Sequence, residues 1–305
     1  MHKEFFIQDS KIISKTEWEH EIKGIRNSIK QEISDKNEAR KGLASALTRA
    51  VYERLPDEKF GIMFSGGVDS SLIALLSKKS GKPAKDFICY TFGFQDDNSK
   101  EPEDIGSAEC AARKLDLSIK ARIINLQEAE ALIKKTVKIL GPELNNVVNV
   151  GVGGVVLGCI EIAKGDGIRH LFSGLGSEEL FAGYQRHKLA KNKQEECWKG
   201  LLGMYERDLL RDFAVASSQG IILSTPFLDK ELIGVAMRIP DKFKIDNDKS
   251  KIILREAAEE LGLPKEIAWR GKRAAQYGSR LDKAISRLAK KNGFKFKKDY
   301  LKSLD

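Results

Sequence analysis

Cysteine and long apolar runs are both scarce in this sequence. Its 305 residues contain four cysteines, too widely spaced for a C-x-x-C pair, so a zinc or iron–sulfur site has little support. We expect each cysteine to be reduced within a core element. No apolar run approaches the roughly 20 residues of a membrane-spanning helix, and the polar start MHKEFFIQDSK is not typical of a signal peptide. A cytoplasmic protein without a membrane partner is therefore expected.

The charge balance is positive, and it is concentrated at the C-terminus. The net charge of +9 suits an anionic ligand, and ATP by itself would be sufficient to explain it. A basic tail from about residue 283 contains two phenylalanines among its lysines: Lys290, Lys291, Phe294, Lys295, Phe296, Lys297, Lys298 and Lys302. Such runs are usually a solvated face. RNA binding is the weaker alternative, because no recognition module accompanies the tail.

Residues 60–71, read as FGIMFSGGVDSS, predict a buried strand, a tight glycine turn and the first turn of a helix. Glycines there let backbone N–H groups face an anion, and the helix amino terminus adds partial positive charge. Ser65, Ser70 and Ser71 supply hydroxyl donors, and Asp69 supplies a carboxylate suited to magnesium. The loop lacks the GKS/T ending of a Walker A motif and is not G-x-G-x-x-G. A phosphate-binding loop is indicated, and a plain strand–turn–helix is the alternative.

Strands and helices alternate on the carboxyl side of this loop, which predicts a parallel sheet covered on both faces. Expected strands at 86–94, 117–124 and 169–173 alternate with helices at 104–115, 126–140 and 146–164. Beyond about residue 185 the strand signals fade, and helices are expected at 197–214, 230–238, 250–261 and 281–291. We therefore divide the chain into an extension (1–36), an α/β core (37–190) and a helical C-terminal part (191–305).

Two further stretches carry candidate functional residues. Residues 172–184 read FSGLGSEELFAGY, in which Glu178 and Glu179 open a helix after a strand. Acids at a helix amino terminus are favoured by the macrodipole alone, but on a parallel sheet Asp69 and one of these glutamates would bridge a magnesium ion. Residues 269–273 read WRGKR, either a solvated basic face or the position of a lysine that stabilises charge on a reacting phosphate.

These motifs together resemble a known family. SGGVDSS resembles the pyrophosphate (PP) loop of the ATP pyrophosphatases, which cleave ATP between the α- and β-phosphates. With SGLGSEELFAGY, STPFLDKELIGVAMRIPDKFKI, KIILREAAEELGLPKEI and WRGK, the chain resembles the synthetase domain of class B asparagine synthetases over roughly residues 38–280. GYQRH and KRAAQYGSR are closer still to the asparagine synthetase domain-containing proteins. The resemblance implies an α/β fold with a parallel-sheet, adenine nucleotide α-hydrolase-like core and a helical C-terminal part.

The resemblance also implies roles for particular positions. Asp69 and Glu178 match magnesium ligands, and Lys272 matches a lysine that stabilises the adenylation and amidation transition states. The positions that match ATP contacts are Met63, Ser65, Gly66, Gly67, Asp69, Ser70, Ser71, Phe92, Ser173 and Gly174. ATP and Mg²⁺ are the implied cofactors.

Two departures from the family pattern bear on the reaction. Leu175 stands where asparagine synthetases carry the glutamate of SGEG, and a leucine can neither accept a proton nor attract ammonium. Glu179, one helical turn further on, is the candidate to replace that glutamate. Residue 2 is His2 rather than the nucleophilic cysteine of the family's glutaminase, and only 64 residues precede Ser65. We therefore expect free ammonia, or ammonia from a separate glutaminase, as the nitrogen donor.

The sequence thus predicts an ATP-dependent, AMP-forming ligase that adenylates a small carboxylate and amidates it with ammonia. Asparagine synthesis from aspartate is in doubt because of Leu175. A PP-loop RNA-modifying enzyme is one alternative, for which the basic tail is the support. A nucleotide-binding interaction protein without catalysis is the other.

Overall fold

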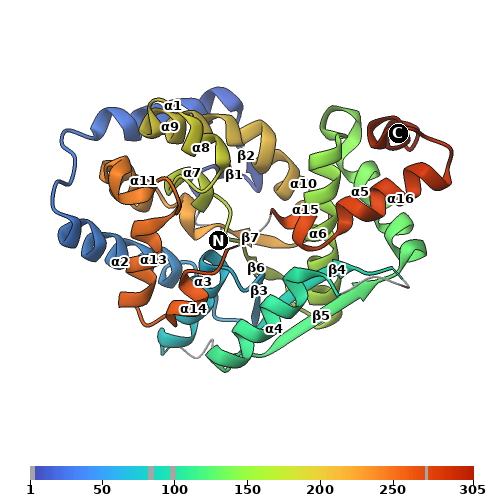
Figure 1. Ribbon diagram of the computed structural model, residues 1–305, viewed down its shortest axis with the longest axis horizontal. Coiled ribbons are helices and arrows are strands. Elements are labelled where there is room, and N and C mark those ends of the chain that lie inside the picture. The colour runs from blue at the N-terminus through green and yellow to red at the C-terminus, as the bar shows by residue number, and fades with distance from the viewer. Residues whose placement is uncertain (1–3, 82–85, 97–100, 272–273) are drawn as a thin grey trace.

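Five parallel strands form the sheet at the centre of the protein (Figure 1). The computed structural model describes residues 4–81, 86–96, 101–271 and 274–305. The strand order is β5-β4-β3-β6-β7, with bounds Phe60–Met63 (β3), Phe87–Phe94 (β4), Ile119–Ile124 (β5), His170–Phe172 (β6) and Ile222–Ser224 (β7). The predicted parallel α/β fold is confirmed. Because β3 lies between β4 and β6, the loops that follow β3 and β6 are neighbours at the carboxyl edge of the sheet.

Helices cover both faces of the sheet. Figure 1 shows α5, α6 and α16 stacked on one side and α2, α3 and α13 on the other. The helices of the first half are α1 (Lys15–Ser28), α2 (Lys36–Tyr52), α3 (Val68–Lys79), α4 (Glu103–Leu115), α5 (Leu126–Leu144), α6 (Val147–Gly165) and α7 (Ser177–Leu180). Those of the second half are α8 (Gln185–Leu189), α9 (Lys193–Met204), α10 (Leu210–Ser218), α11 (Lys230–Arg238), α12 (Asp241–Lys244), α13 (Ile252–Glu260), α14 (Lys265–Ala268), α15 (Ala275–Gly278), α16 (Leu281–Lys291) and α17 (Lys297–Lys302).

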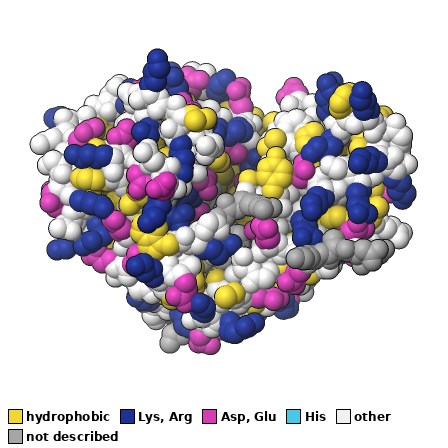
Figure 2. All heavy atoms as spheres, viewed as in Figure 1, with side chains coloured by type: hydrophobic (Ala, Val, Ile, Leu, Met, Phe, Trp, Pro, Cys, Tyr) yellow, Lys and Arg dark blue, Asp and Glu magenta, His cyan; other side chains and the backbone are white. Residues whose placement is uncertain are grey.

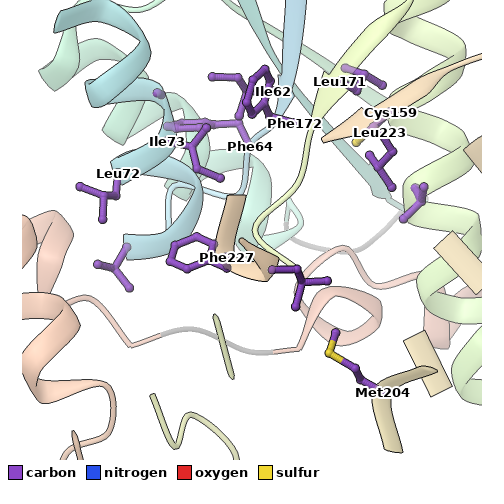
Figure 3. Close-up of a cluster of buried hydrophobic side chains, with 14 of the residues drawn as sticks. Ile62, Phe64, Leu72, Ile73, Cys159, Leu171, Phe172, Met204, Leu223 and Phe227 are labelled. Carbon is purple, nitrogen blue, oxygen red and sulfur yellow. The ribbon is translucent and has the colours of Figure 1, made fainter. Parts of the chain in front are cut away.

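A continuous apolar core joins the sheet to these helices. Figure 3 shows side chains of the strands, among them Ile62, Phe172 and Leu223, packed with side chains of α3 and of the segment after β7. The rings of Phe60 and Phe172 on neighbouring strands have centroids 5.2 Å apart. Each such fully buried side chain contributes roughly 1.5–3 kcal/mol relative to an exposed one. The core therefore fixes the positions of the strand ends from which the loops project.

Helix α6 packs unusually close to its neighbours because of its glycines. A Cβ atom at Gly158 would lie 2.5 Å from the ring of Phe92, and one at Gly154 would lie 2.4 Å from Leu281. Contrary to the expectation that no apolar run approaches the length of a membrane-spanning helix, α6 is by length and composition apolar enough to cross a membrane, but 61% of its apolar window is buried inside the protein. We interpret α6 as a core helix.

The C-terminal part differs from the sequence expectation in two respects. It contributes β7, a strand of three residues that is too short to show a readable alternation, and β7 forms one edge of the sheet. The single helix expected at 197–214 is α9, a π-helical segment (Tyr205–Leu209) and α10. A further short element, the 3₁₀ turn Pro226–Leu228, precedes Asp229, which caps α11.

The N-terminal residues form a small hairpin, β1 (Ile7–Gln8) with β2 (Lys11–Ile12). A buried ion pair ties this segment to the core: Arg54 of the segment after α2 donates to Glu4 (2.9 Å) and to Asp229 (3.1 Å). Glu4 also accepts from the backbone N–H of Thr225, beside β7. Three of the cysteines are buried, but Cys110 is exposed on α4, so the expected core position is wrong for that one.

Candidate active site

Two cavities meet at the carboxyl edge of the sheet. The first cavity, of about 330 Å³, lies between the ends of β3 and β4, helix α6 and residues 173–179. The second cavity, of about 630 Å³, lies between the start of α3, the start of α13 and residues 269–271. Asp69 and Glu178 line both cavities, so this pair of carboxylates stands where the two meet.

The first turn after β3 has the geometry that its glycines predict. Gly66 has φ +66°, and a Cβ atom there would lie 2.5 Å from the carbonyl oxygen of Ser107. Arg270 donates to the carbonyl oxygens of Ser65 (2.8 Å) and Gly66 (3.2 Å), and to the hydroxyl of Ser107 (2.8 Å). Carbonyl oxygens that would repel an anion are therefore bonded to a cation. Arg270 is half-buried and braces the loop, so it is not part of a solvated face.

The loops after β3 and β6 lie against each other, as expected. A Cβ atom at Gly174 would lie 3.0 Å from Cβ of Asp69, so only glycine allows this approach without a shift. Asp69 is buried, and both of its carboxylate oxygens lie 2.9 Å from Nζ of Lys251. The same ammonium lies 2.8 Å from Glu178 and 2.9 Å from the hydroxyl of Ser177. The oxygens of Asp69 and Glu178 thus converge on one cation.

Lys251 is the central residue that the sequence interpretation missed. Burial alone would lower the pKa of Lys251, but the carboxylates of Asp69 and Glu178 outweigh burial and raise that pKa, so the side chain carries its charge. Its backbone is left-handed, with φ +56°, a strained conformation that commonly occurs at functional sites. One sequence signal existed: Lys251 precedes α13, and the macrodipole disfavours a cation at a helix amino terminus.

Charged side chains of both signs surround the rest of the second cavity. Lys249, Arg255 and Lys265 line it together with Lys251. Arg255 donates from Nη1 to the carbonyl oxygens of Ala268 (2.5 Å) and Arg270 (3.2 Å), which holds the segment after α14 in place. Five acidic residues line it as well, so the two signs are equal in number, and a phosphate chain bound there would depend on the individual cations rather than on a net positive charge.

The first cavity contains the other predicted residues, with a few exceptions. Met63, Ser65, Ser70, Phe92, Ser173, Gly174 and Glu179 line it. Gly66, Gly67 and Ser71 are not among the lining residues of either cavity, and Ser71 Oγ is buried without a hydrogen-bond partner in the described part of the chain. Their predicted contact with ATP stays a prediction. Lys272 lies outside the described residues.

A chain of alternating charges also lines the first cavity. We call it the arginine–carboxylate cluster, and it consists of Glu179, Arg186, Arg207, Asp208, Arg211 and Asp212. Arg207 donates to Glu179 and, at 2.6 Å, to Asp208, while Arg211 donates to Asp208 (3.2 Å) and Asp212 (2.6 Å). Burial, aided by the charge of Asp208 and opposed by Arg207, raises the pKa of Glu179 to about 7. Apart from Glu179, the sequence interpretation missed this cluster; its signal was the run ERDLLRD inside an apolar helix.

The geometry of Gly66 gives a first prediction. In Gly66→Ala, the left-handed backbone costs about 1–2 kcal/mol, and the new methyl group displaces Ser107 and the loop. We expect a lower free energy of unfolding and an ATP affinity reduced by at least about tenfold, a loss of roughly 1.4 kcal/mol. Urea unfolding and calorimetric titration of ATP measure the two effects.

The matched control is Gly81→Ala. Gly81 also has φ +66°, but a methyl group there would meet no other atom of the described residues within 4 Å. In that variant the free energy of unfolding should fall only by the cost of a left-handed alanine backbone, and the affinity for ATP should be unchanged. Equal ATP affinity in both variants would show that the close packing of Gly66 on Ser107 does not shape the binding loop.

Comparison with known proteins identifies relatives of this chain. The sequence model of the family described as Asparagine synthase matches residues 42–199 and 190–293. The chain belongs to the asparagine synthase family. Among curated relatives of this family member, a putative glutamine-hydrolysing asparagine synthetase of Methanocaldococcus jannaschii is 33% identical over an alignment of 300 residues, which covers 86% of this chain and 53% of that protein. Asparagine synthetase B of Escherichia coli is 30% identical over an alignment of 258 residues, which covers 81% of this chain and 45% of that protein.

This member of the asparagine synthase family thus spans about half the length of the curated relatives it matches. Family membership, with the parallel sheet and the loop after β3, confirms the predicted adenine nucleotide α-hydrolase-like fold. Its placement in the branch of asparagine synthetase domain-containing proteins stays a prediction.

Solved structures show weaker likenesses. The NH3-dependent NAD synthetase of Campylobacter jejuni aligns with a TM-score of 0.33 and 19% identity, over 50% of this chain and 62% of that one. The U34-tRNA thiolase NcsA of Methanococcus maripaludis aligns with a TM-score of 0.39 and 13% identity, over 88% and 82%. Likenesses of this degree carry no information about function.

Proposed function

We propose that this family member is an ATP-dependent, AMP-forming amide ligase that adenylates a carboxylate and then amidates it with ammonia. The observation that carries the proposal is the position of Asp69 and Glu178 on the boundary of two cavities. One cavity offers the ends of β3 and β4, with Met63 and Phe92, which suit a nucleoside. The other offers Lys251, Arg255 and Lys265 as cations for a pyrophosphate, although as many acids as cations line it. A molecule of ATP that spans the boundary has its α–β phosphoanhydride beside the carboxylate pair.

The protein's own groups account for most of the chemistry in this proposal. Hydroxyls of Ser65 and Ser70 and the start of α3 bind phosphate oxygens. Lys251 stabilises negative charge as it develops on the departing pyrophosphate, in a buried setting where a fixed cation is most effective. The carboxylate substrate lies in the first cavity and attacks the α-phosphate, which gives an acyl-adenylate; ammonia then displaces AMP. Positioning and electrostatics provide the catalysis.

The carboxylate pair fits Mg²⁺. Mg²⁺ is usually held by one or two carboxylates together with substrate phosphates and water, and the oxygens of Asp69 and Glu178 already converge on one cation, the ammonium of Lys251. Bound there with ATP, the metal would neutralise charge on the phosphates. Lys251 then shares the site with it or turns toward a phosphate oxygen.

Leu175 argues against aspartate as the substrate that is adenylated. It lines the first cavity on the loop after β6, and it is apolar where the family's glutamate would handle ammonium. Glu179 lines the same cavity and stays the candidate to replace that glutamate, although its carboxylate is buried and bonded to Arg207. An acyl group that is bulkier or less polar than aspartate is the better fit to a leucine wall.

The nitrogen donor is ammonia in this proposal, and it comes free or from a separate glutaminase in the cytoplasm. RNA modification has less support. Figure 2 shows lysine and arginine side chains gathered near the C-terminus, over α16 and α17. Two of these lysines are paired with acids, Lys291 with Glu130 (3.8 Å) and Lys297 with Asp282 (2.5 Å), which weakens the case for a dedicated nucleic-acid surface.

The direct test is to measure AMP and pyrophosphate released by the purified protein from ATP·Mg, across a panel of carboxylic acids with ammonium. We expect release that depends on both an acid and ammonium. Glutamine in place of ammonium should give neither amide nor glutamate. ATP binding without AMP release under any condition would favour the non-catalytic alternative, and AMP release that requires RNA would favour the RNA-modifying one.

The role of Asp69 gives a second prediction. In Asp69→Ala, the affinity for ATP measured by calorimetry should lose most of its dependence on Mg²⁺, because one of the two carboxylates on the shared boundary is gone. Asp166→Ala is a matched control, since Asp166 is an ion-paired carboxylate bonded to Tyr90 (2.9 Å) outside both cavities. Metal-dependent affinity that is unchanged in Asp69→Ala would show that Asp69 is not a ligand.

Lys272 gives a third prediction, which rests on the family resemblance alone. We expect Lys272→Ala to lower the rate of AMP formation by roughly 100-fold or more, the loss typical of a group that stabilises transition-state charge. The affinity for ATP should change little. A turnover rate equal to that of the unmodified protein would place Lys272 on a solvated basic face.

A further inference from the structure

The arginine–carboxylate cluster presents cations rather than acids to the first cavity. The side chains of Glu179, Asp208 and Asp212 are 1%, 10% and 5% exposed, and each is bonded to an arginine. Arg207 and Arg186 are 33% and 36% exposed. The acids therefore hold the arginines in place, and guanidinium groups form the accessible surface of the cluster.

Part of the hydrogen-bonding capacity of these two arginines is unused. Arg207 donates from Nε and Nη2, and its Nη1 has no partner among the described residues. Arg186 Nη2 is buried and has no hydrogen bond within the described part of the chain, although it lies 3.5 Å from Glu179. Arg186 stacks over the ring of Tyr184, 4.2 Å from the centroid, which orients its plane. A planar guanidinium with free N–H groups is suited to a carboxylate.

The backbone beneath Arg207 is also irregular. Residues 205–209 form a π-helix, a segment that occurs frequently at functional sites because it changes the direction of the side chains it carries. Here it presents Arg207 to the first cavity between two regular helices, α9 and α10. Phosphates do not require these arginines, because the second cavity has its own cations.

An apolar surface shares this cavity with the arginines. Val148, Val152 and Val155 lie on one face of α6, spaced by four and three residues, and all three line the cavity together with Leu175. Val148 is 47% exposed, which is high for a valine on a core helix. The side chain of Arg211 lies within 3.5 Å of a Cβ position at Gly153, so the cluster and the valine face of α6 are adjacent.

We propose that the acyl substrate is an aliphatic dicarboxylic acid. Its far carboxylate is bound by Arg207 and Arg186, and its methylene chain lies along Leu175 and the valines of α6. The near carboxylate is the one adenylated. The inference rests on the proposed ligase function and adds to it the class of the substrate, longer and less polar in its middle than aspartate.

The test compares matched acids with the purified full chain. AMP formation is measured with ATP·Mg and saturating ammonium for pentanedioate against pentanoate, for hexanedioate against hexanoate, and for aspartate. We expect kcat/KM for each diacid to exceed that for its monoacid by at least about 100-fold, because a site built for hydrogen bonds rejects an analogue that lacks the group. Arg207→Lys and Arg186→Met should reduce this ratio by about tenfold or more without changing the KM for ATP. Arg26→Met, an exposed arginine paired with Glu195, is the control and should keep the ratio.

Three results would overturn the inference. Monoacids that react as well as diacids would show that no second carboxylate is bound, while the ligase function would stand. Arginine variants that slow all acids equally would assign the cluster a structural role only. Aspartate as the best acid would show that the cavity does not select a longer chain. If no acid supports AMP release, the proposed function fails together with the inference.

Discussion

Lys251→Met is expected to reduce AMP formation by at least about 1,000-fold, the upper range for removal of a group that stabilises transition-state charge. The reason is the placement of its ammonium, which contacts Asp69, Glu178 and Ser177 at 2.8–2.9 Å on the boundary of the two cavities. Steady-state release of AMP and pyrophosphate measures the loss. Lys230→Met is the matched control, because Lys230 also begins a helix and pairs with Glu21 but is exposed.

Loss of this lysine should also destabilise the protein. Removal of one partner from a buried ion pair costs about 3–5 kcal/mol, since the remaining charge is left unpaired. The double variant Lys251→Met with Asp69→Asn removes that charge, and we expect it to regain much of the free energy of unfolding but none of the activity. This separates a chemical role from a structural one.

Magnesium provides an independent readout of the same site. In Lys251→Met, two carboxylates are left without their cation, so Mg²⁺ alone should raise the melting temperature of this variant. In the unmodified protein, Lys251 already neutralises the pair, and Mg²⁺ without ATP should have little effect. If Mg²⁺ does not change the melting temperature of Lys251→Met, then Asp69 and Glu178 do not hold a metal. Normal AMP formation in that variant would show that Lys251 is not part of the mechanism.

Leu175→Glu is expected to create or strongly increase asparagine synthesis from aspartate, ATP and ammonium. A positioned proton acceptor contributes roughly 10²–10⁴-fold in rate, so a gain of at least about tenfold is expected even with imperfect placement. The unmodified protein should make little or no asparagine, because Leu175 gives the first cavity an apolar wall. Chromatographic detection of asparagine, together with AMP release, measures both.

Leu175→Gln is the control for shape and polarity, since glutamine has the size of glutamate but accepts no proton. It should not gain activity. Conversely, Leu175→Glu should impair the acids that the unmodified protein prefers, because a carboxylate replaces apolar contacts. The contrary result is that the unmodified protein makes asparagine rapidly, at a rate that Leu175→Glu does not improve. That result would indicate that Glu179 already acts as the proton acceptor, and that the protein is an asparagine synthetase acting on aspartate.

Local patterns were enough to predict the sheet and two of its loops. The glycines after β3 and β6 and the apolar runs before them are features of a few consecutive residues, and backbone rules act over that range. The alternation of strands and helices predicted a parallel sheet, and with it that Glu178 or Glu179 lies near Asp69; the family resemblance selected Glu178. The prediction missed β7, because a strand of three residues is too short to show a pattern. It also missed the π-helix at residues 205–209, because the apolar pattern continues through the change of helix type.

The sequence by itself therefore determined the fold class, the family and the position of the loop that we propose binds phosphates. Only the tertiary structure brought Lys251 to Asp69 across 182 residues, and Arg207 to Glu179 across 28. It also turned Arg270 from an apparent surface charge into a brace for the phosphate loop. The physical reason is that the energy of an ion pair depends on distance and burial, and both are set by the packing of helices that are remote in the chain. The sequence shows that a residue is a cationic lysine, but only the fold determines which acidic groups lie close to it.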